Sequence, residues 1–147
     1  MITLEKCLDI DGYFVSGSLD EMQQFSDRMK GCYQIIIEPF DPYLLDELML
    51  AFEEEAGPHI QLDTSEVFTR KGGLILETIR KPHAPDFANE GDLCPGTSIT
   101  ACVFPELKYS SDHEYGYPQL SIVGVDRYVD PTELIDWDSS PTQSWDF

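Results

Sequence analysis

The clearest periodic pattern in the chain is an apolar stripe in the run from Tyr43 to Ala56. Asp41 suits the N-cap of a helix, Pro42 suits its first position, and Gly57-Pro58 ends the pattern. The stripe repeats at the spacing of one helical face and consists of Leu44, Leu45, Leu48, Met49 and Phe52. The pattern predicts a helix over residues 43–56.

A second helix is predicted between Ser18 and Gly31. Ser18 and Glu21 have the spacing of a capping box, in which each side chain caps the other's backbone N–H. Apolar side chains follow at spacings of three and four, and Gly31 is placed to end the helix. The apolar residues of this stripe are Met22, Phe25 and Met29.

Strand patterns occupy much of the remaining chain. The run Cys32–Ile37 is β-branched and almost wholly apolar, which is typical of a central strand covered on both faces. Residues 2–15 predict one or two short strands with a turn at Asp11-Gly12. Residues 66–70 and 74–81 predict a hairpin, and 98–104 and 119–125 predict two further strands. Residues 82–98 and 109–117 are predicted loops, and 132–137 a short helical turn.

This order of elements predicts an α+β fold. We expect a mostly antiparallel sheet with two main helices packed on one face, although the β-α-β-α start would also suit a parallel α/β unit. A length of 147 residues fits a single domain over residues 1–147, with 126–147 as an acidic, aromatic-containing C-terminal segment. The chain is 41% hydrophobic and 12% aromatic, which excludes a disordered acidic tail.

The charge is the most unusual property of the chain. Nine Lys and Arg residues stand against 28 Asp and Glu residues, which gives a formal net charge of −19. This balance argues against a positive surface for nucleic acid or anionic lipid. No apolar run is long enough to span a bilayer, and the N-terminus lacks the pattern of a signal peptide, so a cytoplasmic location is expected.

The four cysteines are Cys7, Cys32, Cys94 and Cys102. We expect them to be buried, reduced thiols that pack as small apolar groups. A zinc site built from Cys94, Cys102 and either His83 or His113 is the alternative, but its spacing is not that of common zinc motifs. We therefore expect no metal and no cofactor.

The acidic residues are grouped along the chain. No Lys or Arg lies between Lys30 and Arg70, and basic residues are paired at Arg70-Lys71 and Arg80-Lys81, near opposite ends of a predicted strand whose edge they would blunt. A small domain needs a net charge of only about 2–8 for solubility. The excess indicates either a saline habitat or an acidic surface that steers a basic partner.

The resulting functional hypothesis is an acidic inhibitor that is not an enzyme. It would bind and occlude a basic nucleic-acid-processing protein such as a nuclease, without direct contact to nucleic acid. Two settings fit: an immunity protein that neutralises a toxin, as in a toxin–antitoxin pair, and a phage-type nucleic-acid mimic such as an anti-restriction or anti-CRISPR protein. The predicted partner-binding residues are Asp46, Glu53, Glu54, Glu55, Asp136, Trp137 and Asp138.

Two other hypotheses remain open at this point. The triplet Asp112-His113-Glu114 has side chains capable of acid–base chemistry, and with the 82–98 loop it would line the pocket of a small-molecule-binding or hydrolytic domain. The other is a structural or adaptor domain whose charge reflects a salty environment.

Overall fold

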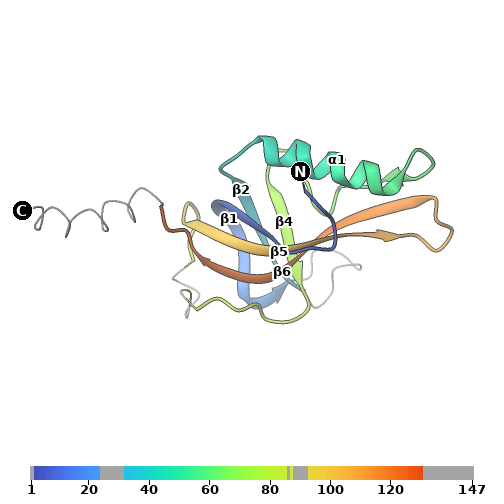
Figure 1. The fold of residues 1–147 in the computed structure, drawn as a ribbon. Helices are drawn as coiled ribbons and strands as arrows, with labels where there is room; N and C mark the ends of the chain where they lie inside the picture. The colour runs from blue at the N-terminus through green and yellow to red at the C-terminus, as the bar shows by residue number, and fades with distance from the viewer. Residues whose placement is uncertain (1, 24–31, 86, 88–92, 131–147) are drawn as a thin grey trace, which may run out of the picture.

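The computed structural model describes residues 2–23, 32–85, 87 and 93–130, and this part of the chain is mostly β-sheet. Figure 1 shows long, curved strands wrapped around one another with a single helix lying across them. In chain order the elements are β1 (Leu8–Gln23), β2 (Cys32–Pro39), α1 (Tyr43–Ala56), β3 (Gln61–Leu62), β4 (Leu74–Thr78), β5 (Ser98–Tyr109) and β6 (Tyr115–Arg127).

Five of the strands close into a barrel. Strand β1 pairs antiparallel with β2 and β5, β2 pairs antiparallel with β4, and β5 pairs antiparallel with β6. A parallel pairing of Glu77 in β4 with Ser121 in β6 completes the ring in the order β1-β2-β4-β6-β5. The short β3 pairs in parallel with the start of β6, on the same edge of β6 that β4 uses further along. A five-stranded closed barrel of this kind is the architecture of the OB fold.

The core lies inside this barrel because alternate residues of each strand point inward. In β4, Leu74 and Leu76 are fully buried, and Ile99, Ala101 and Val103 of β5 face them across the interior. The intervening residues of each strand point outward. The outer face of the barrel is therefore available for a different role.

The helix predicted over residues 43–56 is confirmed and ends at Gly57 as expected, but its N-cap is Pro42 and not Asp41. Asp41 Oδ1 accepts a hydrogen bond of 2.9 Å from the Tyr43 N–H, and Gly57 donates its N–H to the Glu53 carbonyl at 3.0 Å with a positive φ of 78°. Both contacts satisfy backbone groups that a helix end leaves without partners. The predicted stripe packs on the barrel, with Leu48 and Phe52 fully buried.

Several strand predictions are also confirmed. The run Cys32–Ile37 lies within β2, which has a neighbour on each side, and the predicted strands 98–104 and 119–125 lie within β5 and β6. The predicted turn at Asp11-Gly12 is wrong, because both residues lie inside β1 and pair with β5. Of the predicted hairpin, only 74–78 forms a strand, with a Phe68–Leu74 bridge beside it.

The second predicted helix is wrong where it can be compared. Strand β1 continues through Gln23, so the capping-box residues Ser18 and Glu21 are extended. Ser18 pairs with Gln34 of β2, and Leu19 is buried in the core. The pairing with β2 and the burial of Leu19 stabilise a strand here. The capping-box pattern is a weak local preference for a helix, and tertiary contacts override it. Residues 24–31 lie outside the described part of the chain.

The predicted α+β class is therefore wrong. The described residues contain one helix, and the sheet is a mixed barrel, where we had expected a mostly antiparallel sheet carrying two helices on one face. The predicted helical turn at 132–137 lies outside the described residues, and the single-domain assignment of 1–147 stays a prediction. Within the described ranges, no helix is both long enough and apolar enough to cross a membrane.

None of the four cysteines is in a disulfide bond, but they are less buried than expected. Cys7 and Cys94 are exposed, so the prediction is wrong for them, whereas Cys32 and Cys102 are half-buried. No group of three or more metal-ligating side chains occurs in the part of the chain that the structure describes.

Cys102 should be alkylated more slowly than the exposed Cys94. Burial raises its pKa to about 11, and the nearby Asp9 carboxylate and Cys7 add to this shift. The reactive thiolate of Cys102 is therefore scarce at pH 8, and it reaches half of the population only at a pH of about 11. Timed iodoacetamide labelling with peptide mass spectrometry should show Cys94 modified well before Cys102, and Asp9→Asn should accelerate only Cys102. Equal rates for Cys94 and Cys102 at pH 8 would contradict this.

Candidate nucleic-acid interface

Two adjoining hollows follow the outward faces of β4 and β6. One has a volume of about 630 Å³ and the other about 330 Å³. The two hollows follow one another along β4. Ile75 lines the first hollow, and Glu77 lines the second; these two residues are on the same face of the strand, two positions apart. We call them together the β4–β6 groove. Its aromatic end is defined by Phe68, Arg70, Ile75 and Tyr115, and its polar end by Glu77, Arg80, Lys108 and Gln119.

The aromatic end is shaped by a turn and the first residue of β6. The Thr69 N–H donates to the Gly73 carbonyl at 3.0 Å, and the Gly73 N–H donates to Thr69 Oγ1 at 2.8 Å. This tight turn carries Arg70 at the rim of the hollow. Tyr115 begins β6 with its side chain 39% exposed. The aromatic end thus combines exposed apolar area with a cation.

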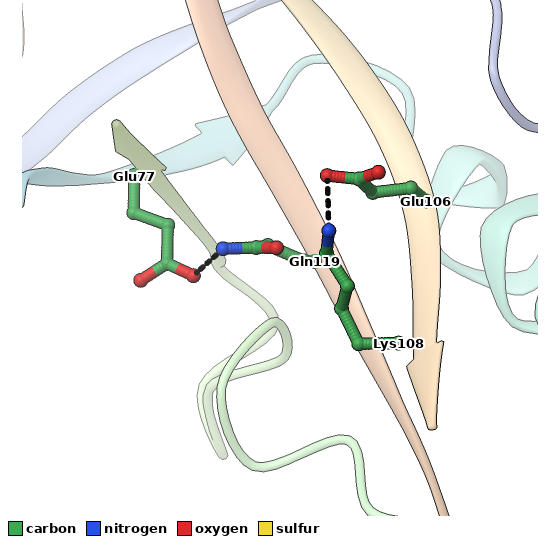
Figure 2. Close-up of polar contacts among 4 residues, drawn as sticks. All are labelled: Glu77, Glu106, Lys108 and Gln119. Carbon is green, nitrogen blue, oxygen red and sulfur yellow. Dashed lines mark hydrogen bonds and ion pairs between the residues drawn. The ribbon is translucent and has the colours of Figure 1, made fainter. Parts of the chain in front are cut away.

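The polar end is built on hydrogen bonds and an ion pair, which Figure 2 shows together. Gln119 Nε2 donates to Glu77 Oε1 at 2.7 Å, and Lys108 Nζ lies 3.4 Å from Glu106 Oε1. Cys32 also lines this end, where burial raises the pKa of its thiol and the negative charge of Glu77 adds to the shift. The polar end therefore has an ordered set of donors and acceptors.

The groove has a different charge balance from the whole chain. Its described lining residues include three cations, at Arg70, Arg80 and Lys108, and three carboxylates, at Asp63, Glu77 and Glu106. The full sequence has nine cations against 28 carboxylates. Lys71 and Lys81 follow two of the arginines directly and are exposed. The lining of the groove is thus formally neutral, whereas the molecule as a whole is strongly acidic.

The acidic residues predicted to bind a partner lie elsewhere. Asp46, Glu53, Glu54 and Glu55 are exposed on α1, but they do not share one face, because residues nine apart on a helix point in opposite directions. Glu53 and Glu54 line a separate hollow of about 610 Å³ beside the end of α1. Asp136, Trp137 and Asp138 lie outside the described residues. A partner-binding role for these seven residues stays a prediction.

The triplet Asp112-His113-Glu114 forms the tight turn between β5 and β6. Asp112 Oδ1 accepts hydrogen bonds from Ser110 Oγ at 2.6 Å and from the Glu114 N–H at 3.0 Å. These bonds, that of Ser110 foremost, lower the pKa of the Asp112 carboxyl. His113 has a positive φ of 58°, and all three side chains are exposed. The triplet organises a turn and lines neither hollow of the groove, and a hydrolytic or small-molecule site there stays a prediction.

The comparisons with known proteins identify the fold. No protein-family model matches the chain, and no curated protein sequence matches it. Among solved structures, the chain resembles the single-stranded DNA-binding protein of bacteriophage Enc34 in complex with ssDNA, with a TM-score of 0.59 at 12% identity over 84% of this chain and 86% of that one. It also resembles gp2.5, a single-stranded DNA-binding protein of bacteriophage T7, with a TM-score of 0.57 at 13% identity over 85% of this chain and 94% of that one.

These likenesses contradict the inhibitor hypothesis. The two solved structures are named as single-stranded DNA-binding proteins, and neither name is that of a nuclease inhibitor, an immunity protein, a toxin–antitoxin component or a nucleic-acid mimic. The exclusion of direct contact with nucleic acid is contradicted on the same grounds. The error arose because net charge is a sum over the whole molecule, whereas binding depends on where the charges lie.

Sequence reasoning missed the groove, although one signal was visible. The pairs Arg70-Lys71 and Arg80-Lys81 flank β4. The sequence suggests that they protect an exposed strand edge from pairing with other chains. Strand β4 is not an edge, because it pairs with β2 on one side and β6 on the other. Tyr115 belongs to a group of aromatic residues beside acidic loop residues, a composition that suits an interface. Nothing in the sequence places Tyr115 or Gln119 near these cations, since only the β4–β6 pairing brings them together.

Proposed function

We propose that the protein binds single-stranded DNA in the β4–β6 groove. The observation that carries this proposal is a groove on the outer face of a closed OB-type barrel whose lining combines the exposed Tyr115 side chain with three cations, in a molecule that is otherwise strongly acidic. OB folds that bind oligonucleotides use the face of their second and third strands together with neighbouring loops, and β4 is the third strand in the order of this barrel. Binding is the whole of the role, with no chemical step.

Each end of the groove has a distinct task in this proposal. At the aromatic end, Tyr115 and Phe68 offer apolar surface on which unpaired bases stack, and Arg70 lies beside them for a phosphate. At the polar end, Arg80 and Lys108 provide further phosphate contacts. Stacking requires an exposed base face, which a duplex does not present, so single strands are favoured.

The acidity of the remaining surface restricts where the strand binds. Phosphates are repelled by the carboxylates of α1, including Asp46 and Glu53, so a nucleic acid has one favourable approach, along the groove. Because like charges also oppose the encounter over long distances, we expect association to be slower than for a basic DNA-binding protein.

Fluorescence anisotropy with a labelled 20-nucleotide oligo(dT) tests the proposal. Binding should weaken as salt increases, because each phosphate contact releases condensed counterions, and log K should fall against log salt with a slope of about −0.7 per contact. Arg80→Ala should make this slope shallower by roughly one contact. Lys6→Ala removes an exposed cation that lines neither hollow and is the matched control.

The same titration has clear contrary outcomes. Absence of binding at low salt, or equal affinity for single-stranded and duplex DNA of the same length, would overturn the proposal. Equal changes of slope for Arg80→Ala and Lys6→Ala would show that binding occurs away from the groove.

A further inference from the structure

A row of buried polar side chains crosses the outer face of the barrel. In the described part of the chain, the buried polar or charged residues are Ser18, Gln34 and Glu77. The strand registers place them side by side, with Ser18 opposite Gln34 and Gln34 opposite Glu77. Glu77 is in turn opposite Ser121 of β6, two residues beyond Gln119. Burial of polar side chains costs more desolvation free energy than burial of apolar side chains at the same positions. A row of buried polar residues therefore indicates a role other than stability.

The last step of this row, between Glu77 and Gln119, reaches the groove. A carboxylate can only accept hydrogen bonds, so the Gln119 amide must turn its nitrogen toward Glu77 and its carbonyl oxygen away (Figure 2). The Glu77 side chain is only 6% exposed. The pair therefore presents mainly acceptor oxygens, in an arrangement that is fixed and largely desolvated before any ligand arrives.

Acceptor oxygens distinguish between the two pyrimidine bases. Cytosine has an amino group at C4 that donates hydrogen bonds, whereas thymine has a carbonyl oxygen at the same position. Carboxylates read cytosine through this amino group. A thymine in the same place would set its carbonyl oxygen against the acceptors, and a site built around a buried polar group rejects a ligand that leaves the group unpaired.

The surroundings of the pair complete a nucleotide-sized site. Arg80 and Lys108 line the same hollow and can take phosphates, while Ile79 is 74% exposed and offers an apolar surface to a sugar or base face. We infer that the polar end of the groove binds an amino-bearing base, with Glu77 accepting from it and Gln119 held in place by Glu77, so that cytosine is preferred to thymine. This inference rests on the proposed binding of single-stranded DNA.

The test compares labelled dC12 and dT12 at pH 8 in fluorescence anisotropy. The native protein should bind dC12 about tenfold more tightly than dT12. Glu77→Gln keeps the shape of the side chain and adds an amide donor, which suits the thymine carbonyl, so the ratio should fall to one or below. Glu38→Gln makes the same change at an exposed carboxylate of β2 that lines neither hollow of the groove, and it should leave the ratio unchanged.

A second variant keeps the inference falsifiable if Glu77→Gln does not fold, as judged by its thermal melt. Gln119→Ala removes the half-exposed partner and should lower the dC12 to dT12 ratio while dT12 affinity stays within about twofold. Equal binding of the two oligonucleotides by the native protein, or a ratio that neither variant changes, overturns the inference alone. Failure to bind either oligonucleotide overturns the proposed function as well.

Discussion

Replacing Gly17 with alanine should lower the free energy of unfolding by about 3 kcal/mol or more. Gly17 lies within β1 at a φ of +108°, which side-chain-bearing residues rarely adopt. A Cβ atom there would stand 2.2 Å from the Gln34 carbonyl oxygen and 2.7 Å from the Ile35 Cα, both backbone atoms of the paired strand β2. Neither atom can move without separating the two strands. Thermal unfolding followed by circular dichroism should show Tm lower by roughly 10 °C.

Gly96→Ala is the matched control, because it separates the strain of a positive φ from the steric clash with β2. Gly96 has a similar φ of +93°, but an added Cβ would meet nothing within 4 Å. Gly96→Ala should therefore lower the free energy of unfolding only by the cost of placing an alanine at a positive φ, about 1–2 kcal/mol. If Gly17→Ala were no more destabilising than Gly96→Ala, the close approach of β1 to β2 would not be the constraint that we infer.

The fold could be predicted from the sequence where the deciding contacts are local. The helix α1 is an example, since Asp41 and Gly57 mark its ends and its apolar stripe has one period throughout. The stretch from Ser18 to Gln23 is the opposite case, because its capping-box pattern is local but its pairing with β2 is not. The barrel closes through a parallel pairing of Glu77 in β4 with Ser121 in β6. These two residues are far apart in the sequence, and no hydrophobic or polar pattern around them indicates that they pair. The closed architecture was therefore beyond prediction.

The candidate site was harder to predict than the fold. A net charge of −19 is a property of the whole chain, and it excluded nucleic acid only on the assumption that charge is spread evenly. The arginines at 70 and 80 are ten residues apart, and nothing in the sequence indicates that they flank one groove. Lys108 and Tyr115 join them only through the pairing of β5 with β6 and of β6 with β4. The proposed site in this chain is built from cross-strand neighbours, which sequence periodicity does not identify.

Tyr115→Ala should weaken binding of oligo(dT) by about 5- to 150-fold, the range that corresponds to 1–3 kcal/mol for one stacked base. The Tyr115 ring lines the aromatic end beside Phe68 and Ile75, so it can stack on a base from the open side of the groove. Tyr115→Phe keeps the ring and should bind within about twofold of the native protein. Anisotropy titrations at one fixed salt concentration measure all three affinities.

Tyr43 provides the control for loss of an exposed tyrosine. Its side chain is 72% exposed at the start of α1 and lines neither hollow of the groove, so Tyr43→Ala should leave the affinity unchanged. Because Tyr115 also pairs with Gln61 of β3, the thermal melt of Tyr115→Ala must first show that the barrel is intact. With the fold intact, an unchanged affinity for Tyr115→Ala, or an equal loss for Tyr43→Ala, would remove the aromatic end from the binding site. A large loss for Tyr115→Ala, restored by Tyr115→Phe, would instead assign stacking to this ring, since the phenylalanine ring retains the aromatic face and lacks only the hydroxyl.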